Sequence, residues 1–250
     1  MDKQSGYSSK EQFVHQVFES IAPKYDRMNT LLSFRRHKAW RRFAMHKMNV
    51  KAGDNAIDVC CGTADWAISL AQASGDGCVI GLDFSDQMLA YGEDKVKGAG
   101  LTDRVTLVKG NAMQIPYPDN SFDHATIGFG LRNVPDIHRV ISEMTRVVRP
   151  GGQVVSLELS KPTWPLFRTI YYVYFQKILP LLGKLFANRY EQYRWLPESL
   201  VSFPDYRELA GVFRECGLSG VKAYPLTGGI AALHIGFKEQ GSLKKDGGHG

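Results

Sequence analysis

Three short apolar segments, each ending in a polar or glycine-rich turn, constrain this chain most. They are Asn55–Asp65, Val79–Asp83 and Val108–Ala112. Apolar runs of this length are typical of buried parallel strands. Open α/β sheets bind their ligands just beyond the carboxyl ends of such strands. The three turns are therefore expected to meet at one ligand-binding crevice.

The residues at the first two turns suit a nucleoside. Gly62 has no side chain, so the backbone can approach a ligand closely there. A helix that begins near Ala64 would direct free N–H groups at a carboxylate or phosphate. Asp83 can accept hydrogen bonds from two ribose hydroxyls.

The charge around the first turn separates two classes of nucleoside cofactor. A dinucleotide oxidoreductase also carries an acid about 20 residues after its glycine turn, so the spacing from Gly62 to Asp83 fits both classes. This turn lacks a G-x-G-x-x-G pattern and is flanked by Asp58 and Asp65. The two carboxylates repel a pyrophosphate and attract a sulfonium cation with an α-amino group. We therefore expect S-adenosylmethionine rather than NAD, with a ligand-free α/β domain as the remaining alternative.

Composition favours one large domain in a reducing compartment. The 250 residues are 44% hydrophobic, which is enough for a packed core. Cysteines 60, 61, 78 and 216 form no CxxC pair and lack metal-ligand spacing, so no metal site is expected. The polar N-terminal segment lacks a signal core, and no run approaches about 18 apolar residues. A cytoplasmic protein without an anchor is expected.

The order of predicted elements indicates a mostly parallel sheet. Residues 1–50 form a helical preface, residues 51–240 the main domain, and residues 241–250 a disordered tail. Strands and helices alternate after Ala56, which implies right-handed crossovers and helices on both faces of the sheet. An antiparallel pair closes the domain. The predicted helices are 66–73, 86–97, 136–148 and 206–216, and the later strands are 78–83, 105–109, 123–129, 153–159, 221–224 and 231–237.

An aromatic-rich insertion at about 161–203 interrupts this alternation. Arg168, Lys177, Pro180 and Lys184 break its apolar runs, so a membrane span is not expected. The insertion is expected to be a lid over an apolar ligand or an element at a membrane interface. A helix packed on the sheet or at a homodimer contact is the alternative.

The positive charge is concentrated in one block. The chain has a net charge of +6, which suits an anionic partner. The block contains no acid, and aromatic residues lie within it: Arg35, Arg36, Lys38, Arg41, Arg42 and Lys47, with Phe34, Trp40 and Phe43. It is either a contact surface or the solvated face of a helix that packs on the core.

Three further motifs resemble one family. They are Val17–Asn29, with Tyr25 near its centre, Gly128–Asp136, which contains Gly-Leu-Arg-Asn-Val, and Glu158–Pro162. Together with the cofactor turns they resemble the ubiquinone/menaquinone-biosynthesis C-methyltransferases. This resemblance covers about Val17 to Phe237. It implies the class I S-adenosylmethionine-dependent methyltransferase fold, a Rossmann-like seven-stranded α/β sheet with an antiparallel last strand.

The resemblance also implies site residues. Thr63, Asp83, Asn111 and Ala112 match the family's cofactor-contacting positions. Thr63 would bond the methionine carboxylate or a nearby water, Asp83 the ribose, and the Asn111-Ala112 turn the adenine edge. Asp58 and Gly62 complete the expected cofactor site.

One position favours the menaquinone branch of the family. Members that serve both quinone pathways tend to carry Ser where this chain has Gly128. The expected reaction is methylation of a ring carbon of a prenylated naphthohydroquinone, which converts demethylmenaquinol to menaquinol. Its lipid-buried substrate implies transient contact with the inner face of the cell membrane.

The chemistry assigns roles to a second set of residues. Deprotonation of one hydroxyl activates the unsubstituted ring carbon for in-line attack on the methyl group. Arg132 and Asn133 are expected to stabilise the resulting oxyanion. The family's arginine has been assigned a role in deprotonation, but its pKa above about 12 makes it a poor base, so a water is expected to accept the proton. A structural salt bridge from Arg132 to Asp136 or Glu158 is the alternative.

Two other residues have open or structural assignments. Tyr25 is expected to close the pocket or to bond the cofactor, with packing of the helical preface as the alternative. His124 is expected to be a structural strand residue rather than a base.

Other functions remain as alternatives. One is methylation of another quinol or lipid-like molecule, as in the ubiquinone pathway. A non-catalytic membrane-surface protein that retains the fold is another. Nucleic acid is not expected as a partner, because the chain lacks an Asn-Pro-Pro-Tyr type base-flipping motif.

Overall fold

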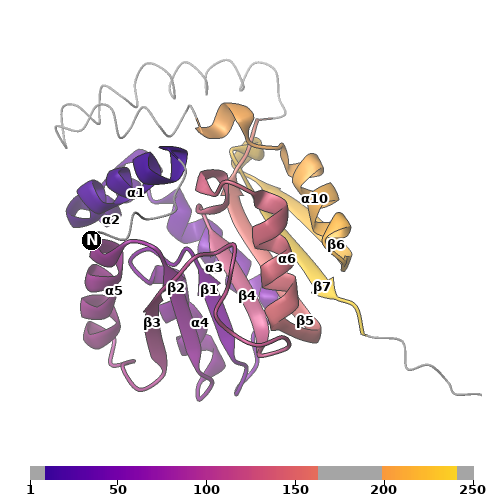
Figure 1. Cartoon of the computed structure of the whole chain (residues 1–250), viewed down its shortest axis with the longest axis horizontal. Coiled ribbons are helices and arrows are strands. Elements are labelled where there is room, and N and C mark those ends of the chain that lie inside the picture. Colours follow the sequence, from indigo (N-terminus) through magenta and orange to yellow (C-terminus); the bar gives the residue numbers. More distant parts are fainter. Residues whose placement is uncertain (1–8, 163–198, 241–250) are drawn as a thin grey trace, which may run out of the picture.

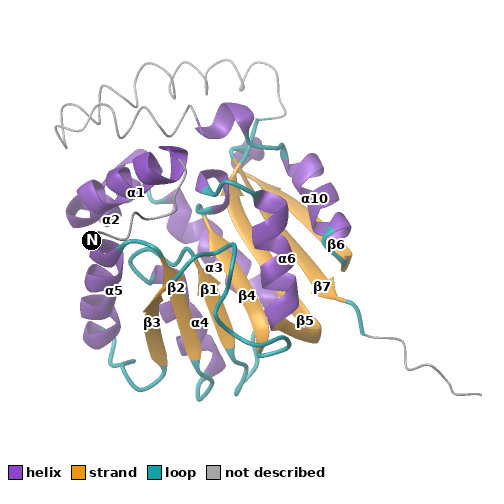
Figure 2. Ribbon diagram, viewed as in Figure 1, coloured by secondary structure: helices purple, strands orange, loops and turns teal. Residues whose placement is uncertain are grey.

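A seven-stranded sheet forms the centre of the structure, a computed structural model that describes residues 9–162 and 199–240. The strand order is β3-β2-β1-β4-β5-β7-β6, and helices cover both faces (Figures 1 and 2). The strands are β1 (Ala56–Val59), β2 (Val79–Asp83), β3 (Val105–Lys109), β4 (Phe122–Gly128), β5 (Val148–Leu159), β6 (Leu218–Leu226) and β7 (Ala231–Lys238). The expected seven-stranded class of fold is confirmed.

The helices alternate with these strands as predicted. After the N-terminal α1 (Ser9–Ile21), η1 (Ala22–Lys24), α2 (Tyr25–Leu32) and α3 (Arg36–Met48), they are α4 (Asp65–Ser74), α5 (Asp86–Gly98), η2 (Leu131–Asn133), α6 (Ile137–Val147), α10 (Tyr206–Glu215) and η4 (Thr227–Gly229). Only β7 runs antiparallel to its neighbours, β5 and β6. Strand β5 begins at Val148 rather than 153, because its first residue pairs with Phe122 before a register shift.

Successive strand residues pack on opposite faces of the sheet, as the two-residue period of a strand requires. Ala56 belongs to the core beneath α3 and α4, whereas Ile57 belongs to the core beneath α6 and α10. Both residues are fully buried. This burial on both faces explains why β1 shows no alternation of apolar and polar residues.

Part of the predicted organisation lies outside the described residues. The insertion at about 161–203 falls largely within 163–198, and the tail is 241–250. In the described parts of the chain, no helix is both long enough and apolar enough to cross a membrane.

The N-terminal helices lie beside the carboxyl ends of β1, β2 and β3, where the three predicted ligand-binding turns are found. Figure 1 shows α1 and α2 at one end of the sheet, next to α5. The Glu19 Oε1 atom on α1 accepts hydrogen bonds from Ser85 Oγ (2.7 Å) and from the backbone N–H of Gln87 (3.3 Å). The helical preface therefore forms one wall of the space above the strands.

Candidate active site

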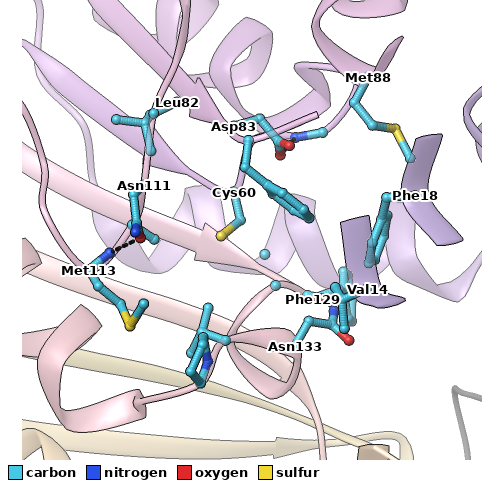
Figure 3. A pocket seen from close by; sticks show the side chains of 18 of the residues that line it. Val14, Phe18, Cys60, Leu82, Asp83, Met88, Asn111, Met113, Phe129 and Asn133 are labelled. Atoms are coloured by element: carbon cyan, nitrogen blue, oxygen red, sulfur yellow. Dashed lines mark hydrogen bonds between the residues drawn. The ribbon is translucent and has the colours of Figure 1, made fainter. Parts of the chain in front are cut away.

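Two adjoining cavities lie at the carboxyl ends of the strands. The first, which we call the Asp83 cavity, is lined by residues that follow β1, β2 and β3 and by Phe18 of α1 (Figure 3). The second, the Arg132 cavity, is lined mainly by α2, α3, the turn after β1 and η2. Both cavities share a set of lining residues: Phe18, Tyr25, Cys60, Gly62, Gly128, Phe129 and Asn133. A molecule bound in one can therefore reach a molecule bound in the other.

Asp83 ends β2 and is 5% exposed. Its Oδ2 atom accepts the backbone N–H of Gly62 at 2.8 Å, and Oδ1 accepts that of Ser85 at 3.0 Å. Burial raises the pKa of Asp83, although these two hydrogen bonds act in the opposite direction. The carboxylate thus joins the turn after β1 to the start of α5 while it lines the cavity.

The turns after β1 and β3 complete the Asp83 cavity. Gly62 has a φ of +53°, and a Cβ placed there would meet only the ring of Tyr25, at 3.9 Å. The backbone of this turn is therefore open toward the cavity. Asn111 and Ala112 also line this cavity, and the Asn111 Oδ1 atom accepts the N–H of Met113 at 2.8 Å. The three turns predicted to converge do so in the structure.

Asp58 lies on β1 and lines the Arg132 cavity. It is 2% exposed, and its carboxylate accepts hydrogen bonds from Thr126 Oγ1 (2.7 Å) and the Ala67 N–H (3.2 Å). Burial raises the pKa of Asp58 to about 7, against the effects of these hydrogen bonds and of the Arg41 charge. This carboxyl group therefore titrates near neutral pH.

A network of charged side chains ties the N-terminal helices to the turn after β1. The Lys95 ammonium on α5 contacts Asp26 at 2.7 Å, Asp65 at 2.5 Å and Thr63 Oγ1 at 3.0 Å. Thr63 Oγ1 donates in turn to Asp26 Oδ1 at 2.8 Å. Arg41 on α3 pairs with Asp65 at 2.9 Å. Thr63 thus lies at the cofactor turn, but its hydroxyl bonds to the helical preface.

Tyr25 opens α2 and lines both cavities. Burial raises the pKa of its phenol, whereas a hydrogen bond with Asn29 acts to lower it. The hydroxyl therefore stays protonated at neutral pH, and the Tyr25 side chain belongs to the wall that the two cavities share.

Arg132 follows β4 in the short helix η2 and lines the Arg132 cavity. Its Nη1 atom contacts Glu158 Oε1 at 2.5 Å and the Phe129 carbonyl at 2.7 Å. The two charged side chains are 8% and 1% exposed. Arg132 Nε is buried without a hydrogen-bond partner in the described part of the chain. One N–H group of the guanidinium is therefore left over from the ion pair with Glu158.

Asn133 lies in η2, beyond the carboxyl end of β4, and His124 lies near the start of that strand. Asn133 is next to Arg132, lines both cavities and donates from Nδ2 to the Phe129 carbonyl at 3.3 Å. His124 pairs in register with Ala56, at the start of the strands, and its Nε2 atom lies 2.8 Å from Asp54 Oδ2. His124 is a residue of β4, as predicted, and it does not line either cavity.

Sequence reasoning did not single out three residues that line or brace these cavities. Asp26 and Lys95 brace the cofactor turn, and His37 lines the Arg132 cavity beside Ser33. Ser33 lies in the turn between α2 and α3, and His37 lies near the start of α3. Their contact depends on the conformation of that turn, with positive φ values at Phe34 and Arg35, so helical spacing in the sequence did not reveal it.

Solved structures of low sequence identity share the fold. A methyltransferase from Thermotoga maritima, described as S-adenosylmethionine-dependent and a possible histamine N-methyltransferase, has a TM-score of 0.65. It is 18% identical, and the match covers 90% of this chain and 100% of that one. An S-adenosylmethionine-dependent methyltransferase from Aquifex aeolicus has a TM-score of 0.57 at 18% identity, with coverage of 78% and 88%.

Two bacterial relatives are much more similar in sequence to this chain than these solved structures are. The demethylmenaquinone methyltransferase of Geobacillus kaustophilus is 58% identical over 93% of this chain and 99% of its own length. That of Bacillus subtilis is 56% identical over 92% and 99%. The family model described as the ubiE/COQ5 methyltransferase family matches residues 7–238. The chain belongs to the ubiE/COQ5 methyltransferase family.

Proposed function

We propose that this protein methylates a ring carbon of demethylmenaquinol to give menaquinol, with S-adenosylmethionine as methyl donor. The observation that carries the proposal is the junction of the two cavities, which Tyr25, Gly62 and Gly128 line from both sides. A donor and an acceptor can meet there without a passage through solvent. The names of the two bacterial relatives supply the acceptor.

The Asp83 cavity fits the nucleoside part of the donor. Asp83 can accept the two ribose hydroxyls, and the turn at Asn111 and Ala112 can bind the adenine edge. Asp58 can pair with the α-amino group, and the open backbone at Gly62 admits the methionine moiety. When bound, S-adenosylmethionine supplies an electrophilic methyl group on a sulfonium.

The hydroxyl of Thr63 is assigned a different role from the one first expected. It donates to Asp26 and accepts from Lys95, so it holds α2 against the cofactor turn. We propose that Thr63 acts on the cofactor indirectly, by positioning the turn that contains Gly62.

The Arg132 cavity fits an aromatic quinol. Trp40, Phe129 and Leu157 provide an apolar wall that excludes water and positions the ring. Arg132 can donate its remaining Nε–H to the quinol oxygen as negative charge develops there. Asn133, on the same turn, can position that oxygen.

Gly128 constrains which acceptor the junction admits. A Cβ at this position would lie 2.8 Å from Trp66 Cε3, well inside contact distance. The Trp66 indole is held in place by a hydrogen bond to Met45 Sδ at 3.2 Å. A serine at position 128 would therefore require Trp66 to move, and we propose that this pair favours the naphthoquinol over the benzoquinol of the ubiquinone pathway.

The corner between α2 and α3 is proposed to dock on an anionic membrane surface. Phe34 and Arg35 have φ values of 49° and 62°, and Phe34 is 73% exposed. Leu31 is 43% exposed on the same corner, and Arg36 is also exposed. Leu32 and Ser33, between these residues, line the Arg132 cavity. Docking here would place the cavity next to the bilayer that holds the prenyl tail.

An assay of methyl transfer tests the proposed function directly. The protein is incubated under anaerobic, reducing conditions with labelled S-adenosylmethionine and either demethylmenaquinol or the corresponding benzoquinol. We expect label in menaquinol and at least about tenfold lower kcat/KM with the benzoquinol, a difference of about 1.4 kcal/mol. Absence of label in menaquinol, with the cofactor bound, would overturn the proposal.

Asp83→Ala should weaken S-adenosylmethionine binding by about 1.5 to 3 kcal/mol. The variant loses charge-assisted hydrogen bonds to two hydroxyls. Isothermal calorimetry measures the dissociation constant, and circular dichroism checks the fold. An unchanged dissociation constant in a folded variant would contradict the ribose assignment.

The affinity for S-adenosylmethionine should rise about tenfold between pH 5.5 and 7. Asp58 has a pKa of about 7 in the free protein, and pairing with the α-amino cation requires its ionised form. Binding therefore releases a proton, and affinity increases until Asp58 is ionised in the free protein. Calorimetry at several pH values measures this dependence.

Two controls separate Asp58 from other titrating groups. Methylthioadenosine, which lacks the α-amino group, should bind to the wild-type protein with no such pH dependence. S-Adenosylmethionine should likewise bind to Asp58→Asn with no such pH dependence. If both retain the wild-type dependence, another group titrates.

Arg132→Lys should lower turnover about 100-fold while the cofactor dissociation constant stays within about threefold. Lysine keeps a positive partner for Glu158 but lacks the guanidinium fork and the Nε–H. Arg132→Ala should lower turnover and should also lower the free energy of unfolding by about 3 to 5 kcal/mol, because the Glu158 carboxylate is left buried without its cationic partner.

The double variant Arg132→Ala/Glu158→Gln separates the two effects. It should regain stability in urea denaturation without regaining turnover. If its turnover returns with its stability, Arg132 is a structural residue only.

Binding to anionic lipid vesicles should fall steeply between about 0.05 and 0.5 M salt, because the Debye length shortens over this range. Leu31→Ser/Phe34→Ser should lower vesicle binding, measured by co-sedimentation, more than Tyr91→Ser does. Tyr91 is an exposed aromatic on α5 and serves as the matched control. Equal vesicle binding by the wild type, the Leu31→Ser/Phe34→Ser variant and Tyr91→Ser would reject docking through the α2–α3 corner.

A further inference from the structure

His37 lies in the wall of the Arg132 cavity, close to the start of α3. The same cavity is lined by Arg132, Asn133 and Tyr25. An imidazole in this wall is within the compartment that the proposed function assigns to the quinol. The methylation chemistry needs a proton acceptor there, because the hydroxyl must lose its proton before the ring carbon is a strong nucleophile.

The hydrogen bonds of His37 select one tautomer of its ring. Ser33 Oγ donates to the Asn29 carbonyl at 2.6 Å, and a carbonyl can only accept. The His37 Nδ1 atom lies 2.6 Å from the same hydroxyl oxygen. With its hydrogen committed to Asn29, the hydroxyl accepts from Nδ1–H. Nε2 then carries the lone pair, and no described residue is bonded to it.

Burial and two neighbouring cations keep this imidazole neutral. Burial lowers the pKa of His37 to about 4, and the positive charges of Arg41 and Lys38 add to the effect. Asp65 and Asp26 act in the opposite direction. The ring is therefore unprotonated, and its Nε2 lone pair is available, at any pH above about 5.

Other groups at the cavity are less suited to accept the quinol proton. Asp58 also lines this cavity and has a pKa of about 7, but the proposed function commits its carboxylate to the α-amino group of S-adenosylmethionine. Burial raises the pKa of Tyr25 and of the Cys60 thiol, so both remain protonated. Arg41 and Lys95 outweigh the burial of Asp65 and hold its pKa below the usual value, with both cations bonded to its carboxylate. Arg132 has no lone pair to offer. His37 is the neutral basic group among these residues.

We propose that His37 is the catalytic base of the methyl transfer, with Nε2 as the atom that takes the quinol proton and Ser33 as the residue that orients the ring. This inference rests on the proposed function and deepens it. It replaces the water that sequence analysis assigned as the proton acceptor.

The proton transfer balances as follows. The quinol O–H bond breaks, its electron pair stays on oxygen, and an N–H bond forms at Nε2. The naphtholate then lies between the imidazolium of His37 and Arg132. In the empty cavity the imidazolium is disfavoured, but the negative charge of the naphtholate stabilises it. Once the ring carbon is methylated, the former naphtholate C–O group is a ketone carbonyl. Nε2–H returns its proton to that oxygen as the proton on the methylated carbon leaves to water, so one proton is released overall.

Replacement of His37 by Asn is the main test. At pH 7 and saturating cofactor, His37→Asn should lower kcat about 100-fold, within the usual range for loss of a general base. The cofactor dissociation constant and the quinol KM should change less than about threefold. His46→Asn is the matched control, because His46 is exposed in the last turn of the same helix. It should keep wild-type kcat.

The pH profile separates a base from a structural residue. Without a base, the rate depends on spontaneous ionisation of the hydroxyl, so kcat of His37→Asn should rise about tenfold per pH unit below the pKa of the quinol. Wild-type kcat should change little between pH 6 and 9. The difference between the two proteins therefore narrows as pH rises.

Added imidazoles provide an independent measurement. His37→Ala should regain turnover with imidazole, and the rescue should increase with the basicity of substituted imidazoles. Ser33→Ala should lower kcat about tenfold or less, with a cofactor dissociation constant close to that of wild type, because the ring is still present but loses its orienting partner. His37→Gln serves where the smaller substitutions do not fold.

The outcomes distinguish this inference from the function on which it rests. Wild-type failure on demethylmenaquinol overturns both. Wild-type turnover with His37→Asn less than about threefold slower overturns the base alone. The base is also overturned if His37→Asn and His37→Gln follow the wild-type pH profile at a reduced level and imidazole restores nothing to His37→Ala.

Discussion

Burial of the Asp83 carboxylate at the end of β2 is the constraint around which the cofactor side of the molecule is built. A buried charge must be satisfied by donors, and here the N–H groups of Gly62 and Ser85 supply them. The first donor belongs to the turn after β1 and the second to the start of α5. Satisfying one carboxylate thus aligns two turns, and α1 adds to the arrangement because Glu19 bonds Ser85. The nucleoside edge of the crevice follows from this arrangement.

The Arg132 cavity, which is proposed to hold the methyl acceptor, depends on the N-terminal helices rather than on the sheet. Lys95 holds Asp26 of α2 and Asp65 of α4 together, and Arg41 of α3 pairs with Asp65. These contacts close α2 and α3 over the turn after β1, which places Tyr25 and His37 in the cavity wall. The pairs are partly exposed, so each contributes little to the free energy of unfolding. Their effect is to fix the position of the wall.

The sheet, the cofactor edge and some residues of the Arg132 cavity could be predicted from sequence, but the contacts that hold the cavity wall in place could not. Strand β3 was predicted with its observed bounds, because local apolar runs and turn residues determine parallel strands in this class of fold. The pairing of Lys95 with Asp26 joins residues 69 positions apart, and no local pattern encodes it. Arg132 was correctly predicted to have Glu158 as a possible partner, but the leftover Nε–H depends on side-chain geometry. The role proposed for His37 depends on its contact with Ser33 and on its place in the same cavity wall as Arg132, which only the tertiary structure supplies.

Charge balance within the Arg132 cavity is consistent with an apolar, uncharged acceptor. Arg132 is neutralised by Glu158, and Arg41 by Asp65, so the cavity presents paired cations rather than a positive field. A neutral quinol can enter such a cavity without displacing a counter-ion. Negative charge appears only when the hydroxyl loses its proton, and at that moment the donor groups of Arg132 and the protonated imidazole of His37 can stabilise it. These groups interact weakly with the neutral quinol and strongly with its anion. They therefore stabilise the transition state more than the ground state, which is the condition for catalysis.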